Sequence, residues 1–235
     1  MRFPLLDRWL TALVAVLIGA ACVDAAPAKL NILFLGDNGH HQPALRFRQL
    51  APVMAARGID LTYTDKADAL NPKTLAGYDG LVVYANTTTI TPEQEKALLD
   101  YVEGGKGFIP LHCASYCFLN SPKYIALVGG QFKSHQTGIF RPKIVDASHP
   151  AMRGVGEFEA WDETYEHHRL ADDRHVLMVR ESGKKREPWT WVRAQGKGRV
   201  FYTASGHDER VFRNAEFHKL LIQGTRWAAD RKSVV

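Results

Sequence analysis

The segment Gly107-Phe108-Ile109-Pro110-Leu111-His112-Cys113 predicts a buried strand that ends at a histidine. Its residues are almost continuously apolar, which is typical of strands in a parallel sheet that is covered on both faces. In an open α/β sheet, ligands bind just outside the carboxyl ends of the strands. His112 therefore marks the edge of the sheet at which we expect a functional site.

Three more apolar runs precede this strand and alternate with helical segments. The runs are residues 30–35, 59–63 and 79–85, and the helices are expected at 43–57 and from Pro92 onward. Thr91 can cap the second helix and Gln94 completes a capping box. This alternation predicts an α/β fold with a central, mostly parallel sheet covered on both faces.

From about residue 143 the pattern changes to strands with few helices between them. We expect strands at 143–145, 157–170, 175–180, 189–194 and 200–203, followed by a last helix at 214–229 that docks on the sheet. No linker or repeat interrupts the chain. The sequence therefore predicts one domain, residues 26–235, with an added antiparallel strand region.

Residues 1–25 have the order of a secretory signal. Arg2 and Arg8 come before an apolar run, residues 10–21, and small residues follow up to Ala25. We expect export to the periplasm or the extracellular space as a soluble protein, since the apolar run is short for a membrane span. Lipid anchoring through Cys22 is the alternative, and the residue three positions before it is not the large aliphatic one that a lipoprotein signal would carry.

Charge and motifs exclude two classes of partner. The chain has 30 Lys and Arg against 25 Asp and Glu, a net charge of +5, and its basic residues are spread out. A nucleic-acid groove would need them clustered. The first strand is not followed by Gly-x-Gly-x-x-Gly, so we expect no nucleotide cofactor. A small-molecule carbohydrate is the partner we expect, while the sequence leaves the oligomeric state open.

Histidines recur where strands or loops end: His40, His41, His135 and His207, besides His112. If the fold collects His112, His135 and His207, their imidazoles suit zinc or another divalent metal. The alternative is a set of hydrogen-bonded histidines without a tightly bound metal, and the absence of a His-x-Glu-x-x-His spacing favours it. The pair His40–His41 is a candidate for substrate binding.

The expected strand 157–170 alternates, so that Trp161, Glu163, Tyr165 and His167 share one face. Aromatic rings beside a carboxylate suit a sugar, and they also suit an ordinary half-buried strand. Glu163 could be a general base or acid if burial raises its pKa. Asp208 could orient His207 or cap a loop.

Several motifs together resemble the ThuA-like (trehalose utilisation) family, across nearly the whole chain from about Lys29 to Ala229. They are Gly36-Asp37-Asn38-Gly39-His40-His41, Leu111-His112, the stretch 129–135, Asp162-Glu163-Thr164-Tyr165, the stretch 196–202 and Gly206-His207-Asp208. The resemblance implies a flavodoxin-like, class I glutamine amidotransferase-like three-layer sandwich and a carbohydrate-related role. It favours placing Glu163 and Tyr165 in the cleft.

One departure from true amidotransferases concerns the nucleophile. Their cysteine sits in a Gly-x-Cys-x-Gly turn, whereas Cys113 here has no flanking glycines and His112 takes the nucleophile's place. We therefore expect no glutaminase activity, and we expect Cys113 and Cys117 to be free, buried thiols.

The sequence thus predicts an exported enzyme that acts on a carbohydrate or oxidised sugar derivative, as a hydrolase, lyase or isomerase. Its chemistry would be acid–base or metal-assisted. The alternative is a non-catalytic carbohydrate-binding or accessory protein of a sugar oxidoreductase system. The expected catalytic residues are His112, Glu163, His207 and Tyr165, and the expected substrate-binding residues are His40, His41, Trp161 and Asp208.

Overall fold

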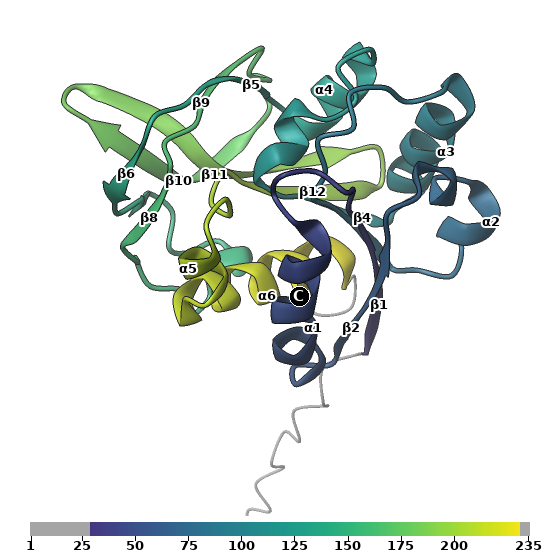
Figure 1. Cartoon of the computed structure of the whole chain (residues 1–235), viewed down its shortest axis with the longest axis horizontal. Coiled ribbons are helices and arrows are strands. Elements are labelled where there is room, and N and C mark those ends of the chain that lie inside the picture. The colour runs from purple at the N-terminus through teal and green to yellow at the C-terminus, as the bar shows by residue number, and fades with distance from the viewer. Residues whose placement is uncertain (1–28, 231–235) are drawn as a thin grey trace, which may run out of the picture.

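A central eight-stranded sheet, in the order β2-β1-β3-β4-β12-β11-β10-β7, organises the structure (Figure 1). The structure, a computed structural model, describes residues 29–230, so the expected signal segment lies outside the described residues. The first four strands are parallel, as predicted: β1 (Leu30–Leu35), β2 (Ile59–Thr64), β3 (Gly80–Val83) and β4 (Gly107–Pro110). Their side chains are mostly buried, which agrees with their continuous apolar runs.

The second half of the sheet is mostly antiparallel. Strand β12 (Gly198–Thr203) pairs parallel to β4, and the next three strands, β11 (Lys185–Gln195), β10 (His175–Ser182) and β7 (Lys143–Ile144), pair antiparallel. Because β12 lies beside β4, the loops that follow these two strands meet at one edge of the sheet. This pairing brings His112 and His207 together although they are far apart in the sequence.

The segment 157–170 does not form the single strand that its alternation predicts. It divides into β8 (Ala160–Glu163), which pairs with β6 (Thr137–Phe140), and β9 (Glu166–His168), which pairs with β5 (Gln131–Ser134). Two different partners, rather than a break in the apolar pattern, interrupt the strand at Thr164 and Tyr165. The partners come from a stretch that we expected to be a loop, and His135 lies between them.

Helices cover both faces of the sheet (Figure 1). One face carries α1 (Pro43–Ala55), α5 (Glu209–Phe212) and α6 (Ala215–Ala229), and the other carries α2 (Pro72–Leu75), α3 (Pro92–Glu103) and α4 (Pro122–Val128). The predicted capping box at Thr91 and Gln94 is present. Helix α6 approaches the sheet closely, since a Cβ on Gly224 would lie 2.4 Å from the Phe201 ring. This face of α6 docks as predicted.

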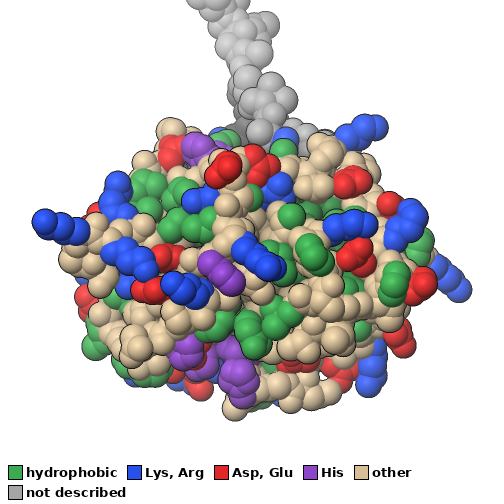
Figure 2. Space-filling model, turned by 90° about the horizontal axis from the view of Figure 1, so that it is seen from above, with side chains coloured by type: hydrophobic (Ala, Val, Ile, Leu, Met, Phe, Trp, Pro, Cys, Tyr) green, Lys and Arg blue, Asp and Glu red, His purple; other side chains and the backbone are tan. Residues whose placement is uncertain are grey.

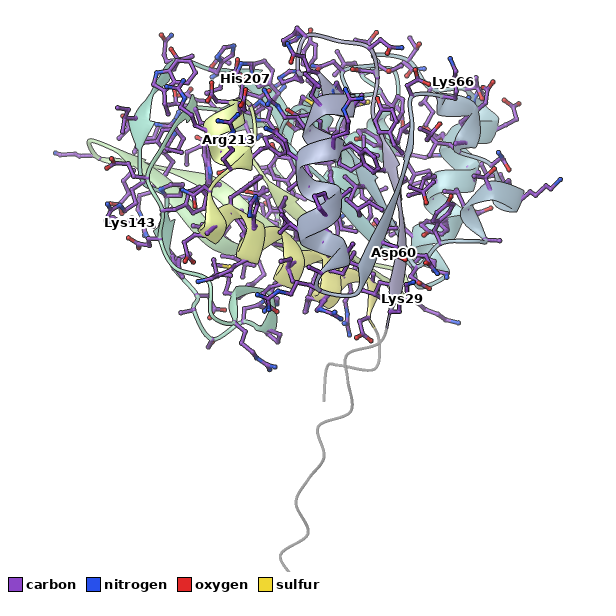
Figure 3. All side chains as sticks on the ribbon, turned by 60° about the horizontal axis from the view of Figure 1, so that its bottom comes forward. Lys29, Asp60, Lys66, Lys143, His207 and Arg213 are labelled. Atoms are coloured by element: carbon purple, nitrogen blue, oxygen red, sulfur yellow. The ribbon has the colours of Figure 1, made fainter. Side chains whose placement is uncertain are left out.

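The two ends of the sheet differ in chemistry. Figure 3 shows His207 at one end of the molecule and the ion pair of Lys29 with Asp60 at the other, where β1 and β2 begin. The carboxyl ends of the parallel strands therefore lie on the His207 side. Within residues 29–230, no helix has both the length and the apolar character needed to cross a membrane.

Candidate active site

Four segments bring histidines and one glutamate to the carboxyl edge of the sheet. His41 follows β1, His112 follows β4, His207 follows β12, and Glu163 ends β8. One ligand atom from each of these four side chains lies within 4.8 Å of the others. The fifth residue, His135, lies between β5 and β6 and reaches the same carboxylate.

Glu163 is the centre of this group. Its Oε2 lies 3.2 Å from His112 Nε2, and its Oε1 lies 3.2 Å from His207 Nδ1 and 3.5 Å from His135 Nδ1. Although these distances are short, neither His112 Nε2 nor His207 Nδ1 makes a hydrogen bond of acceptable geometry with it. The residues that the sequence predicted to converge, His112, His135, Glu163 and His207, therefore lie together around one carboxylate.

The backbone and the ring of His112 are both held in place. Its φ of +45° lies in the left-handed region, which is uncommon for a residue other than glycine. Its Nδ1 lies 2.7 Å from the carbonyl oxygen of Ala204, and since a carbonyl can only accept, this nitrogen carries the proton. The ring stacks on Tyr165, with 4.1 Å between the centroids. The unprotonated Nε2 therefore faces the Glu163 side.

Asp162 positions the loop that carries His207. Its carboxylate accepts hydrogen bonds from the backbone N–H groups of Gly206 and His207, at 2.8 and 2.9 Å, and of Glu163 at 3.0 Å. The Tyr84 hydroxyl donates to the Gly206 carbonyl on the other side. Sequence reasoning missed Asp162, because alternation placed it on the face opposite Glu163. Its position next to Glu163 was the only signal that could have found it.

Burial keeps the two loop histidines neutral. His41 is only 3% exposed, and burial, with smaller effects of His112, His40 and His207, lowers its pKa to about 2. Burial also lowers the pKa of His207, against the opposing effect of Glu163. Neutral imidazole is the form that offers a lone pair to a proton or a metal.

Glu163 is a carboxylate rather than a carboxylic acid. Burial on its own raises its pKa, but contact with His112, His207 and His135 outweighs burial, and the pKa of Glu163 lies below its ordinary value. This corrects the expectation that burial would raise it. Glu163 can therefore accept a proton or stabilise a cation, and it cannot serve as the acid.

A cavity of about 150 Å³ opens above this group. Tyr116, Phe132 and Tyr165 supply its aromatic wall, and His40, His41, Asn86, His135 and Glu163 supply its polar lining. Pockets for drug-sized ligands measure about 300–1,000 Å³, so this one fits a single small unit such as one sugar ring. Figure 2 views this end of the molecule and shows histidine side chains gathered at its lower centre.

Other expected site residues lie outside this cavity. Trp161 packs against Arg210, whose guanidinium carbon lies 4.6 Å from the ring centroid. Asp208 caps α5 through the Arg210 N–H and does not orient His207. Cys113 and Cys117 are free and buried, and burial raises the pKa of the Cys113 thiol well above its ordinary value. A buried thiol of this kind is a poor nucleophile.

A second His–Glu group lies behind the first, and sequence reasoning did not find it. Nδ1 of His167 lies 3.3 Å from Glu187 and Nε2 lies 3.0 Å from the Tyr202 hydroxyl. Tyr202 is in turn 3.1 Å from the carbonyl oxygen of His112 and from the Ser115 hydroxyl. This group is buried and each of its ring nitrogens has a partner. It supports the His112 turn and does not line the cavity.

Solved structures show the same fold. A ThuA-like protein of Bacteroides uniformis ATCC 8492 is 19% identical with a TM-score of 0.72 over 86% of this chain and 92% of its own. One from Parabacteroides merdae ATCC 43184 is also 19% identical, with 0.75 over 86% and 90%. A protein of Thermoplasma acidophilum described as a GMP synthase component is 17% identical, with 0.54 over 85% and 95%. The predicted amidotransferase-like fold is thereby confirmed.

Family membership rests on a separate comparison. No curated protein matches the chain. The family model ThuA, described as trehalose utilisation, matches residues 31–228, which include every element that contributes to the His–Glu group. The chain therefore belongs to the ThuA family.

Proposed function

We propose that the protein is an enzyme that acts on a carbohydrate or an oxidised sugar derivative, and that the reaction takes place above Glu163. The observation that carries this proposal is the buried carboxylate with three histidine nitrogens within 3.5 Å, beneath a cavity with an aromatic wall. The aromatic rings can cover the C–H face of a sugar, while the histidines exchange protons with its hydroxyl or carbonyl groups. The family's description as trehalose utilisation supports a sugar substrate.

The carboxylates of the site favour one reaction class. Most glycoside hydrolases need two carboxyl groups that flank the scissile bond. Among the described residues that line the cavity, Glu163 is the only carboxylate, and the neighbouring Asp162 is buried and holds three backbone N–H groups. Proton transfer next to a carbonyl, as in a lyase or isomerase, fits this inventory better than hydrolysis.

His135 is the residue to which we assign the proton transfer. Its side chain is 38% exposed and lines the cavity, whereas His112 is fully buried. Glu163 faces His135 Nδ1 and would stabilise the imidazolium that forms when the ring takes up a proton, as an aspartate does beside a catalytic histidine. Tyr165 keeps the His112 ring in place by stacking.

The test is a panel of sugars and keto-sugars, with turnover followed by NMR and binding by calorimetry. We expect wild-type turnover of an oxidised sugar, with His135→Ala and Glu163→Gln binding the same compound but turning it over at least about 100-fold more slowly. Glu159→Gln is the matched control, since Glu159 is exposed and pairs with Arg141. Binding by the wild type without turnover of any compound would favour the accessory, non-catalytic function instead.

A further inference from the structure

Four imidazole nitrogens at the site have no hydrogen-bond partner within residues 29–230. They are both ring nitrogens of His41, Nε2 of His112 and Nδ1 of His207. His41 and His112 are 3% and 0% exposed, so water does not replace the missing partners from the surface. Leaving one buried polar group without a partner costs about 1–3 kcal/mol, so an accumulation of them in one place calls for an explanation.

We propose that His41, His112, His207 and Glu163 bind one divalent transition-metal ion of the Zn²⁺ class. Their candidate ligand atoms lie within 4.8 Å of one another. Zn–N bonds are about 2.0–2.1 Å and Zn–O bonds about 2.0–2.2 Å, so ligands on opposite sides of one ion are at most about 4.4 Å apart. Small side-chain movements would close the remaining difference.

The donor atoms fit this class of ion and not the hard cations. Three neutral imidazoles with one carboxylate suit zinc and its neighbours, whereas Mg²⁺ and Ca²⁺ prefer oxygen ligands throughout. Glu163 contributes a negative charge that lowers the repulsion between a dication and its surroundings. The thiols of Cys113 and Cys117 are not part of the group.

The surroundings hold the rings as outer partners hold metal ligands. The Ala204 carbonyl fixes the proton of His112 on Nδ1, which leaves Nε2 as a lone-pair donor toward the group. Asp162 anchors the backbone of His207 through two N–H groups, and Tyr84 anchors Gly206. Outer hydrogen bonds of this kind set both the ring orientation and the tautomer in metal sites.

This ligand set differs from the one predicted from the sequence, which was His112, His135 and His207. His41 takes the place of His135, because its ring centroid lies 5.1 Å from that of His112 and 5.0 Å from that of His207. His135 contacts only the far oxygen of Glu163 and is partly exposed. It stays outside the set, as a group that can move protons.

The inference deepens the proposed function and rests on it for one point, the location of the reaction. A divalent ion there would supply polarisation of a substrate carbonyl or hydroxyl oxygen. Metal binding itself can be measured without substrate. A failure of the metal site and a failure of the carbohydrate activity are therefore separate results.

The experiment titrates the chelator-treated protein with Zn²⁺, Co²⁺ and Mn²⁺ by calorimetry, and measures the metal content of the untreated protein by mass spectrometry. We expect about one equivalent of tight binding, with Zn²⁺ and Co²⁺ preferred over Mn²⁺, a Co²⁺ absorption spectrum typical of nitrogen and oxygen ligands, and a rise in melting temperature on Zn²⁺ addition. The wild-type protein alone decides this part. Binding of none of these ions more tightly than a surface histidine would overturn the proposal.

Single variants then test the ligand set. His41→Ala and His207→Ala should each weaken Zn²⁺ binding by more than about 100-fold, beyond the 10–100-fold typical of losing an outer partner. His135→Ala should change it by less than about threefold, and so should the control His175→Ala, whose ring pairs with Asp146 away from the site. If His135→Ala weakens binding as much as His41→Ala, the ligand set is wrong. Circular dichroism of each variant confirms that it is folded.

Discussion

The molecule contains two His–Glu groups, and they differ in whether their ring nitrogens have partners. In the inner group, His167 places one nitrogen against Glu187 and the other against Tyr202. In the outer group, His41, His112 and His207 surround Glu163 and leave nitrogens without hydrogen bonds. The same residue types thus serve packing in one place and leave binding capacity free in the other. The comparison predicts that the inner group supports stability and the outer group supports function.

The largest effect should be on turnover in the outer group. Glu163→Gln removes the charge beside His135 and should lower kcat by about 100- to 10,000-fold, the range typical of losing one acid–base group. The free energy of unfolding should change by less than about 1 kcal/mol, because Glu163 makes no well-formed hydrogen bond to His112 or His207. Steady-state kinetics and urea unfolding check the two parts. A variant that keeps full activity but loses stability would reverse the comparison.

The next effect should be on stability in the inner group. Glu187→Ala leaves the backbone N–H and Nδ1 of His167 without their acceptor, since Glu187 holds both. Removing one partner of a buried pair should lower the free energy of unfolding by about 2–4 kcal/mol. Urea denaturation measures this, and kcat per folded molecule should stay near the wild-type value. Wild-type stability in Glu187→Ala would show that the inner group is not structural.

A smaller effect, of opposite sign, should follow from replacing His41 in the metal-free protein. Both of its nitrogens are buried without partners, so His41→Phe removes two costly groups while it keeps a ring. We expect a gain of about 1–2 kcal/mol at pH 7.5 in the presence of a chelator. Thermal unfolding with and without Zn²⁺ measures it. With Zn²⁺ present the order should invert, as the wild type gains stability from the ion and the variant does not.

The smallest effect concerns pH. His41 has a pKa of about 2 in the folded protein because it is buried, against about 6.5 for an unfolded histidine. Between these values the unfolded state binds a proton that the folded state does not, so stability is lost as the pH falls below about 6.5. The slope approaches 1.4 kcal/mol per pH unit for this residue. In chelator, His41→Phe should show a slope smaller by about that amount than the wild type, and the control His175→Phe should not.

The elements of the sheet could be predicted from the sequence because each one depends on local pattern. The apolar runs of β1 to β4 and the capping box at Thr91 and Gln94 are visible in a few residues each. The convergence of His112 and His207 followed from a general rule, that parallel strands end at one edge. The division of 157–170 into β8 and β9 was not visible, since it depends on pairing with the β5–β6 segment.

The composition of the site could be predicted only in part, because side-chain direction is a property of the folded chain. His40 and His41 are equivalent in sequence, yet His41 turns inward and His40 is exposed. Asp162 acts through backbone groups more than forty positions away, which no alternation pattern indicates. The pairing of His167 with Glu187 likewise depends on β9 lying beside β11.

The central claim is that the unpartnered nitrogens of the outer group mark a metal site. A crystal of the protein loaded with Zn²⁺, measured at the zinc absorption edge, tests it most directly. The account predicts one strong anomalous peak about 2.0–2.2 Å from His41, His112 and His207 nitrogens and from a Glu163 oxygen. An empty site in a zinc-loaded crystal, or a peak bound through His135 and without His41, would contradict it.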